Sequence, residues 1–454
     1  MKEKVLLLRP YYGVNIHSDV HGDLGECLNT NDVFPDLPFI ISATILDESE
    51  KIDVHIIDAV TEGRLLPDEL IDKIKNERFD TVILKAVAPT VKSDLELLKK
   101  IKNIHSESKV MIAGHVSKLL KNWVQENMKE IDYVIDEPLD EFVYKYVNKT
   151  ENNVGINDFP SPNYALVNYR NYTDDNKNIR LTLQASRGCP MSCSYCPYTA
   201  FYQKVDYRDI DKVIEDIKSI LMLGVDVIQF RDQYFTVDKN RIRELCNRII
   251  EEKLEFKWIC ETRLDGLDFE LVDLLKKAGV FLICFGIESG EESLLNKYNS
   301  KKGLTENSRK MIEYINKSDI ITMAFYMIGF PEDTWETVEK TLKHALYLNS
   351  TYAIFNEYEE CVFDKENVIM SPSLFNTFQN TTNVKTDSIL NDSEKKYLVW
   401  LFSTIYTFKN DSLKQAYTYN YNLVKNNRAL ISQISKVPDD LNVLSEIVRN
   451  YKKC

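Results

Sequence analysis

Two long stretches of alternating strand and helix patterns run along the chain, with a polar segment between them. In residues 1–147, apolar runs typical of buried strands alternate with segments whose apolar residues recur at helical spacing; the strand patterns are KVLLL, DVHIID, DTVILKAV, KVMIAG and DYVID. This alternation predicts a five-stranded parallel sheet with helices on both faces, a Rossmann-like (flavodoxin-like) domain. A ligand of such a sheet is expected at the carboxyl ends of its strands.

The second stretch predicts a different α/β architecture. Residues 148–178 are polar and contain Asn and Pro, which predicts a linker. From 179 to 365 the alternation resumes, with six strand patterns: IRLTLQAS, DVIQFRD, FKWICETR, FLICFGIES, ITMAFYMIGF and AIFNEYEE. Six βα units predict a (β/α)6 partial barrel of the TIM type, with its chemistry at the strand carboxyl ends. Residues 366–454 lose this pattern and are expected to form a mainly helical C-terminal region.

Composition narrows the classes of function. The 454-residue chain carries a formal net charge of −13 and has no Lys/Arg block, which argues against a nucleic-acid partner. Its apolar runs are far shorter than the roughly 20 residues that span a bilayer, and no cleavage-site pattern follows the first strand. We therefore expect a cytoplasmic protein without a membrane partner. The nine cysteines are scattered apart from one cluster, unlike a secreted disulfide framework.

That cluster lies in RGCPMSCSYCP, directly after the first strand of the second stretch. Cys189, Cys193 and Cys196 place three thiolates on one loop, which Gly188 and Pro190 help to turn sharply. Structural zinc needs four Cys or His ligands, and no His is near. A four-iron cubane with one ligand per iron would have one iron left without a protein ligand. The spacing therefore predicts a metal cluster bound by three thiolates, and it leaves open what binds the remaining iron.

With Tyr195, the three cysteines form the pattern C-x3-C-x-aromatic-C. This pattern resembles the signature of the radical S-adenosylmethionine (SAM) enzymes, and the resemblance covers roughly residues 179–360. It implies a [4Fe-4S] cluster on Cys189, Cys193 and Cys196 whose fourth iron binds the amino and carboxylate groups of SAM. It also implies reductive cleavage of SAM to a 5′-deoxyadenosyl radical.

Two further segments resemble parts of the same family. FGIESG (285–290), at the end of the fourth barrel strand, resembles the segment that holds the ribose and amino acid portion of SAM, which implies binding roles for Gly286, Glu288 and Ser289. MIGFPEDT (327–334) resembles the turn after the fifth strand that meets the adenine, which implies a role for Gly329.

Three other residues are predicted to be catalytic. Asp232, beside Arg231, and Arg263 end the second and third barrel strands and are expected to face the same cavity. An inert Arg231–Asp232 ion pair is the alternative for the first, and a structural ion pair for Arg263. Tyr358, after the sixth strand, is a candidate proton or hydrogen donor.

A Rossmann-like domain ahead of such a barrel resembles the arrangement of cobalamin-binding radical SAM enzymes. Cobalamin-binding domains of the methionine synthase and mutase type carry Asp-x-His-x-x-Gly, and DAVTEG keeps Asp58 and Gly63 but places Val60 where the cobalt-ligating His would be. Gly114 stands alone in Ala-Gly-His (113–115) where the family commonly has Gly-Gly, and DEPLDE (136–141) replaces the family's GEGE. The resemblance thus implies cobalamin contacts from Asp58, Gly63 and Gly114. A loop His such as His115 is more often hydrogen-bonded or solvated than a cobalt ligand.

Three classes of function follow from these patterns. The first is a cobalamin-dependent radical SAM methyltransferase acting on a small molecule, supplied with electrons by a donor such as flavodoxin or ferredoxin. The second is a radical dehydratase, epimerase or dehydrogenase whose N-terminal domain has lost cobalamin; Asp232, Cys260, Cys361 and Tyr358 are its candidate donors. The third is a binding or sensor protein with a structural cluster. The sequence indicates neither the substrate nor the oligomeric state.

Overall fold

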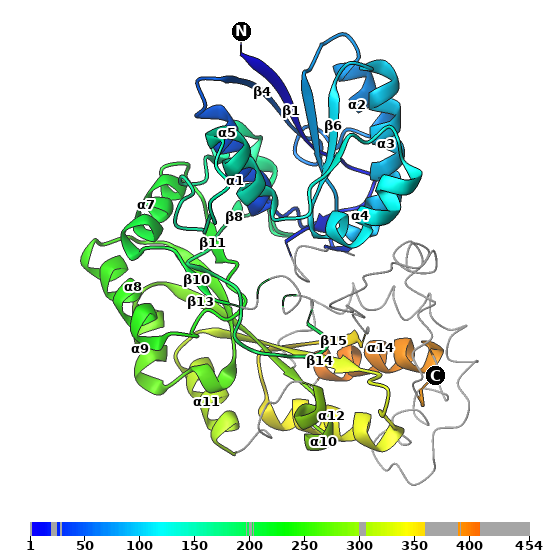
Figure 1. Ribbon diagram of the computed structural model, residues 1–454. Coiled ribbons are helices and arrows are strands. Elements are labelled where there is room, and N and C mark those ends of the chain that lie inside the picture. Colours follow the sequence, from blue (N-terminus) through cyan, green and yellow to red (C-terminus); the bar gives the residue numbers. More distant parts are fainter. Residues whose placement is uncertain are drawn as a thin grey trace.

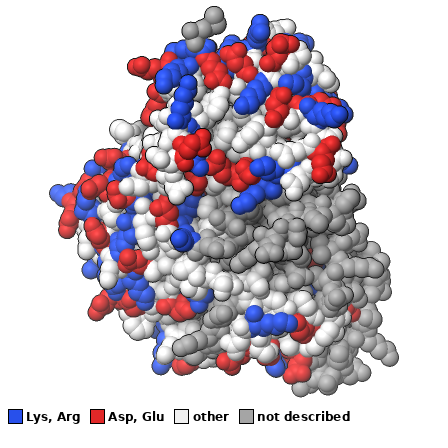
Figure 2. All heavy atoms as spheres, viewed as in Figure 1, with Lys and Arg blue, Asp and Glu red and all other residues white. Residues whose placement is uncertain are grey.

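The computed structural model describes residues 2–19, 25–27, 30–196, 198, 202, 204–298, 306–358, 389–390 and 392–408. Its N-terminal unit lies above a larger half-barrel, and helices α1 and α5 lie at their junction (Figure 1). In the described part of the chain no helix is both long and apolar enough to cross a bilayer. On the face shown in Figure 2, acidic and basic side chains are intermixed.

The N-terminal unit contains the predicted five-stranded parallel sheet. Its strands lie in the order β4-β1-β5-β6-β7, and every ladder between them is parallel. The strands are β1 (Glu3–Arg9), β4 (Ile52–Asp58), β5 (Thr81–Lys85), β6 (Lys109–Ala113) and β7 (Tyr133–Val134). The helices are α1 (Leu37–Asp47), α2 (Pro67–Ile74), α3 (Val91–Ile104), α4 (His115–Asn127) and α5 (Leu139–Asn148). A short hairpin, β2 (Ile16–His17) with β3 (Glu26–Cys27), follows β1. The Rossmann-like prediction is confirmed.

The sequence pattern did not predict helix α1. Its residues from Leu37 to Leu46 are all buried, because the helix packs between the sheet, α5 and the segment that leads to the barrel. A helix that is apolar on every side has no amphipathic period to detect. Its N-terminus is capped by the buried Asp36, whose Oδ1 accepts the Phe39 N–H at 3.0 Å.

The second unit is a six-stranded parallel sheet in the order β15-β14-β13-β12-β11-β8, which confirms the partial barrel. Its strands are β8 (Arg180–Leu183), β11 (Val227–Phe230), β12 (Lys257–Thr262), β13 (Val280–Glu288), β14 (Ile321–Ile328) and β15 (Tyr352–Glu357). The helices, which line its outer side in Figure 1, are α7 (Ile210–Leu221), α8 (Lys239–Glu251), α9 (Phe269–Lys277), α10 (Glu292–Tyr298), α11 (Glu306–Lys317) and α12 (Trp335–Leu348). Helix α14 (Asp392–Phe408) packs against β15.

The two faces of this sheet differ in burial. Ala324, Tyr326 and Ile328 of β14 belong to the main core beneath the helices, whereas the alternate residues Met323, Phe325 and Met327 are only half-buried. On β15, Ile354 of the same inner face is 37% exposed. Parallel sheets usually bury both faces. The inner face along β14 and β15 is therefore the apolar surface that this half-barrel leaves accessible.

The segment predicted as a linker packs tightly between the two units. Its two short helical turns, η2 (Tyr164–Leu166) and η3 (Tyr169–Asn171), are followed by the fully buried Tyr172, whose hydroxyl donates to Asp58 of β4. The Tyr164 hydroxyl donates to the Thr182 carbonyl of β8 at 2.7 Å. The segment thus joins the two sheets through side-chain hydrogen bonds. The predicted boundary after residue 147 lies at the end of α5, the one after 178 lies just before β8, and the one at 365 lies outside the described residues.

A buried carboxyl group in the N-terminal unit predicts a pH-dependent stability. Asp94 of α3 is fully buried; the Tyr12 hydroxyl donates to its Oδ1 at 2.7 Å and the Thr90 hydroxyl to its Oδ2 at 2.9 Å. Burial raises the pKa of Asp94 to about 7. Because this folded-state pKa exceeds the unfolded value of about 3.9, the stabilisation is present at low pH and is lost as the pH rises through 7.

We expect Asp94→Asn, which stays uncharged, to remove this dependence. Relative to the unchanged chain, the variant should gain about 3 kcal/mol in free energy of unfolding between pH 5 and pH 8, because the difference grows by roughly 1.4 kcal/mol per pH unit from pH 5 up to the folded pKa of about 7. Urea unfolding of both proteins at the two pH values measures the difference. The contributions of the other carboxyl groups cancel, because these groups are the same in both proteins. Equal pH dependence of the two proteins would contradict an Asp94 pKa near 7.

Candidate active site

The three motif cysteines lie on a loop that is held at its base by a two-stranded ribbon, β9 (Ser186–Arg187) with β10 (Asp206–Tyr207). The Gly188 N–H donates to Gln233 Oε1 at 2.6 Å, and the Cys189 N–H donates to the Tyr202 carbonyl at 3.3 Å. Gly188 has φ +100°, and a Cβ there would lie 2.0 Å from the Lys204 carbonyl oxygen. Only glycine lets the chain pass this point.

The rest of the loop turns tightly and packs on the barrel. The Cys196 N–H donates to the Cys193 carbonyl at 3.1 Å, and the Ser194 N–H donates to the Tyr298 carbonyl at 2.9 Å. The Tyr195 ring lies edge-on to Phe330, with 6.4 Å between centroids. The aromatic residue of the motif therefore anchors the loop to the carboxyl end of β14.

The burial of the three motif thiols is compatible with a bound [4Fe-4S] cluster. Cys189, Cys193 and Cys196 are half-buried, which leaves their thiolates accessible to a bound group. Across the described residues, no three His, Cys, Asp or Glu side chains converge closely enough to hold one metal ion. A cubane takes one thiolate per iron, so its ligands need not meet at one point.

The end of β13 brings the FGIESG segment to the same edge of the barrel. The β13–β14 register shifts between Gly286 and Glu288, and Glu288 has φ +71°, an uncommon conformation for a residue with a side chain. Behind it, Thr341 Oγ1 lies 3.1 Å from the Ser289 hydroxyl and accepts the Gly290 N–H at 3.0 Å. The bulge and these contacts fix the backbone around the buried Glu288 at the carboxyl end of β13.

A buried carboxylate organises the turn after β14. Asp333 Oδ2 accepts the N–H groups of Gly329 and Phe330 at 2.8 and 3.0 Å, and its Oδ1 accepts the Thr337 hydroxyl at 2.6 Å. Gly329 lies beside the turn that places Phe330 against Tyr195. The sequence motif predicted no role for Asp333; an acidic residue four positions after a strand-end glycine is the signal that could have identified it.

Asp232 lies at a strand end as predicted, but its carboxylate is turned toward the backbone. Oδ2 accepts the Ala185 N–H at 3.0 Å and Oδ1 accepts the Ser186 hydroxyl at 2.6 Å, and burial raises the pKa of Asp232 to about 6. This carboxylate fixes the chain that leads into the cysteine loop. The alternative Arg231–Asp232 ion pair does not form; Arg231 instead bridges Glu261 (2.8 Å) and Asp19 of the N-terminal unit (3.3 Å).

Arg263 forms the structural ion pair that was the alternative for it, and its predicted catalytic role stays a prediction. Its Nε and Nη2 donate to Asp265 at 2.9 and 2.7 Å, whereas Nη1 is buried and has no hydrogen-bond partner among the described residues. Its pKa is raised, because Asp265 and, more weakly, Cys193 outweigh the lowering by burial. One face of the guanidinium is thus held by an ion pair, and the other has an unused donor near the cysteine loop.

The predicted hydrogen donors are spread over different places. Tyr358 is buried with its ring 4.6 Å from Phe330, so it lies behind the cysteine loop. Cys260 belongs to the core beneath the helices, and Cys361 lies outside the described residues. Cys284 of β13, which was not predicted, is the described thiol that packs with the inner-face residues Val227 and Ile259. Side chains alternate between the two faces along a strand, so the FLICFGIES pattern could have predicted that Cys284 lies on the inner face.

At the carboxyl edge of the N-terminal sheet, the residues of DAVTEG differ in role. Asp58 is fully buried and forms an ion pair with Arg9 at 3.1 Å in addition to its bond from Tyr172, so its carboxylate is occupied within the protein. Val60 lines a cavity of about 20 Å³ at this edge. Gly63 has φ +83° and open space around its Cα. The valine side chain at position 60 has no atom that can ligate cobalt.

Other residues at this edge fit a polar ligand. Gly114 has φ +119°, and a Cβ there would lie 2.4 Å from the Ala86 carbonyl oxygen, so glycine allows α4 to begin close to β5. Ser18 Oγ and Ser117 Oγ are buried without a hydrogen-bond partner in the described part of the chain. His115 packs against the Tyr202 ring at 5.1 Å. Unpaired buried hydroxyls suit the amide-rich rim of a corrin, although a cavity of about 20 Å³ would have to open to admit one.

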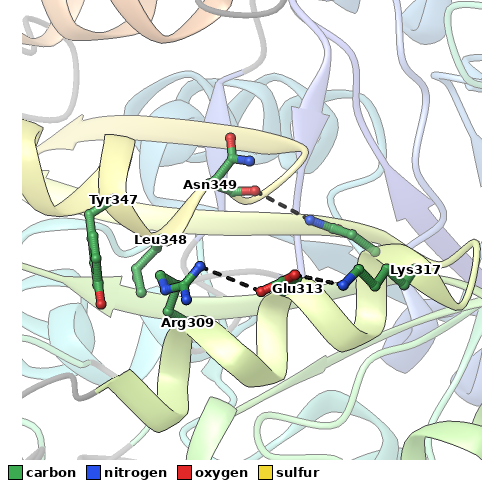
Figure 3. A pocket seen from close by; sticks show the side chains of 7 residues that line it. Arg309, Glu313, Lys317, Tyr347, Leu348 and Asn349 are labelled. Atoms are coloured by element: carbon green, nitrogen blue, oxygen red, sulfur yellow. Dashed lines mark hydrogen bonds and ion pairs between the residues drawn. The ribbon is translucent and has the colours of Figure 1, made fainter.

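A larger pocket, of about 410 Å³, lies between α11 and α12 (Figure 3). Arg309 and Lys317 point to Glu313, at 3.4 and 2.6 Å, so the charges that line it pair with one another. The end of α11 precedes β14, which places this pocket at the amino ends of the strands. It is therefore at the opposite edge from the cysteine loop.

The barrel matches a known protein family. Residues 183–345 match the model of the Radical SAM superfamily. Over 327 residues the chain is 25% identical to an anaerobic magnesium-protoporphyrin IX monomethyl ester cyclase of Cereibacter sphaeroides, covering 64% of this chain and 53% of the cyclase. It is 30% identical over 204 residues to an uncharacterized methyltransferase, PH0819, of Pyrococcus horikoshii, covering 44% of each. The chain thus spans about half the length of these relatives.

A solved structure shares the overall fold. The cobalamin-dependent S-adenosylmethionine radical enzyme OxsB, with aqua-cobalamin and S-adenosylmethionine bound, aligns with a TM-score of 0.65 at 14% identity, over 99% of this chain and 75% of OxsB. The alignment spans both units, so the order of Rossmann-like domain and half-barrel is shared with that protein.

Proposed function

We propose that this chain binds a [4Fe-4S] cluster and SAM and uses them to modify a small molecule, because residues 183–345 match the Radical SAM superfamily. The observation that carries the proposal is the half-buried cysteine loop, packed through Tyr195 onto the same barrel edge that presents Glu288 and Gly329. When bound and reduced, the cluster supplies the electron that cleaves SAM to methionine and a 5′-deoxyadenosyl radical.

The chain's own residues have separate roles in this proposal. Cys189, Cys193 and Cys196 hold three irons, and the fourth stays open to SAM. Glu288, fixed by the β13 bulge, accepts the ribose hydroxyls, and the unused Nη1 of Arg263 donates to a carboxylate of SAM or substrate. Asp333 holds the Gly329 turn in place for the adenine, and Asp232 holds the chain entering the cysteine loop.

The reaction we propose is cobalamin-dependent C-methylation. It is supported by the unpaired hydroxyls of Ser18 and Ser117, by relatives that include a methyltransferase, and by the likeness to a cobalamin-bound enzyme. Methylation needs a methyl donor other than the radical, and cobalamin would supply it. The substrate would lie against the half-exposed inner face formed by Met323, Phe325 and Ile354, so we expect an apolar skeleton.

Cobalt binding tests this finer proposal. Protein reconstituted with iron and sulfide and then given excess hydroxocobalamin is expected to retain about one cobalt per chain after desalting, with a base-off spectrum because Val60 provides no ligand. Ser18→Ala/Ser117→Ala should retain less. Stoichiometric cluster with no retained cobalt would instead favour the second candidate, a cobalamin-independent radical enzyme. The relative named as a cyclase and Cys284, a thiol on the inner face, support a reaction other than methylation, and neither bears on cobalamin.

The partners belong to the same proposal. The cluster would receive single electrons from a donor such as flavodoxin or ferredoxin. We propose that the chain has no nucleic-acid partner, because its formal net charge is −13 and its sequence has no Lys/Arg block.

A further inference from the structure

The cysteine loop contacts the N-terminal unit on both of its sides. Arg187, two residues before Cys189, reaches Asp140 of α5. Tyr198, two residues after Cys196, donates its hydroxyl to the Asp19 carbonyl at 3.0 Å. Further along, the Tyr202 ring lies against His115 of α4. Three separate elements of the N-terminal unit therefore meet a single loop of the barrel.

The contact before Cys189 is a buried, two-point ion pair. Arg187 Nη1 and Nη2 donate to the two carboxylate oxygens of Asp140 at 3.1 and 2.6 Å, and the two side chains are 5% and 0% exposed. Nε and Nη2 also donate to Gln184 Oε1 at 3.2 Å. A paired fork fixes the orientation of the guanidinium as well as its position. The Arg187 guanidinium is thus held by both Asp140 and Gln184. The next residue is the sterically constrained Gly188.

The contact after Cys196 reaches the barrel sheet as well. Besides the Tyr198 hydroxyl, the Asp19 carbonyl accepts Arg231 Nη2 at 3.0 Å, and the Asp19 carboxylate lies 3.3 Å from Arg231 Nε and 2.9 Å from His17 Nε2. All three side chains are buried. Asp19 therefore joins the end of the cysteine loop, the end of β11 and the β2 segment at one point.

We propose that Asp140 and Asp19 of the N-terminal unit are positioning residues for the iron–sulfur cluster. They fix the two sides of the loop that carries the three thiolates, so the N-terminal unit forms part of the cluster site whether or not it binds cobalamin. This inference rests on the proposed role of the cysteines and extends it to a second domain. It also gives a function to DEPLDE, which contains Asp140 and departs from the family pattern.

A buried ion pair could act on stability alone, and the chain contains a matched control. Arg208 and Asp216 form a second buried pair, with Nε–Oδ2 and Nη2–Oδ1 distances of 2.6 and 3.0 Å and side chains 6% and 2% exposed. Asp216 lies on α7, within the barrel, and Arg208 otherwise donates to the carbonyls of Ile156 and Phe159. Asp216→Asn therefore causes a similar loss of charge pairing at Arg208, the residue after β10, while it leaves the Arg187–Asp140 and Tyr198–Asp19 contacts in place.

The test compares Asp140→Asn with Asp216→Asn after anaerobic reconstitution. We expect both to lower the unfolding temperature, but only Asp140→Asn to retain iron and sulfide about 10–100-fold more weakly against a chelator and to change the EPR spectrum of the reduced cluster. Tyr198→Phe, which removes one hydroxyl, should change the spectrum without changing stability. Unaltered spectra and chelator resistance in both Asp140→Asn and Tyr198→Phe would overturn the inference.

These readouts separate the inference from the proposed reaction. If the unchanged chain assembles a cluster but does not cleave SAM, the proposed function fails while the positioning of the cluster can still be measured. Should Asp140→Asn not fold, Tyr198→Phe decides by the same EPR comparison. An unchanged spectrum in that variant contradicts the inference, and a changed spectrum supports it.

Discussion

Cys193→Ser is expected to leave a folded protein that neither holds a [4Fe-4S] cluster nor cleaves SAM. Cys193 lies at the turn of the loop, where its carbonyl accepts the Cys196 N–H at 3.1 Å, so a hydroxyl can replace the thiol without disturbing the backbone. Serine is a poor iron ligand near neutral pH, because its hydroxyl stays protonated where a thiolate forms readily. Losing one of three ligands leaves too few to retain a cubane.

The effect should appear in three measurements. Reconstituted protein is expected to fall from about four irons per chain to background, to lose the charge-transfer absorbance of the cluster, and to form no 5′-deoxyadenosine with dithionite and SAM. Cys246→Ala is the control, because burial raises the pKa of Cys246 to about 12 and keeps that thiol protonated within α8. A Cys193→Ser protein with full iron content would refute the assignment of the ligands.

Gly188→Ala is expected to have the second largest effect. The added methyl group would lie 2.0 Å from the Lys204 carbonyl oxygen, at φ +100°, so the chain must move exactly where it enters the cysteine loop. That movement also breaks the 2.6 Å bond from the Gly188 N–H to Gln233 and displaces Arg187 from Asp140. We expect a loss of several kcal/mol in free energy of unfolding, and a cluster content well below one per chain.

Gly224→Ala separates backbone strain from steric conflict. Gly224 also has a positive φ, +70°, but its added methyl group would meet nothing within 4 Å. We expect it to cost about 1 kcal/mol, as alanine does in a left-handed conformation, and to leave the cluster intact. Urea unfolding and iron analysis of the two variants make the comparison. Equal losses of stability and full cluster in both would show that the close approach to Lys204 does not constrain the loop.

The strands of both sheets were predictable because each is a short apolar run bounded by polar turns, and all eleven patterns fall on strands of the structure. Helix α1 was not predictable from the sequence. A helix buried on every side is a long apolar run in which apolar residues show no helical period. Helices α5, α10 and α11 were missed as well. The linker was expected to be a polar tether; Tyr164 and Tyr172 show that it is instead packed between the units.

The site shows the same division between local and long-range information. The cysteine motif, FGIESG and the Gly329 turn are local patterns, and the structure brings them to one barrel edge. What each strand-end residue contacts depends on partners distant in sequence. Asp232 binds the backbone of residues 185–186, and Arg231 binds Asp19 more than two hundred positions away. No period or spacing within one segment contains such pairings, and Asp140 was not identified for that reason.

The central claim is that the open iron of a three-cysteine cluster on this loop binds and cleaves SAM. The most direct measurement is the formation of 5′-deoxyadenosine by the reconstituted chain under anaerobic, reducing conditions, followed by mass spectrometry. We predict at least one 5′-deoxyadenosine per cluster, and none from Cys193→Ser. A protein with a full [4Fe-4S] cluster that binds SAM but forms no 5′-deoxyadenosine would contradict the claim and leave the cluster a structural or sensing role.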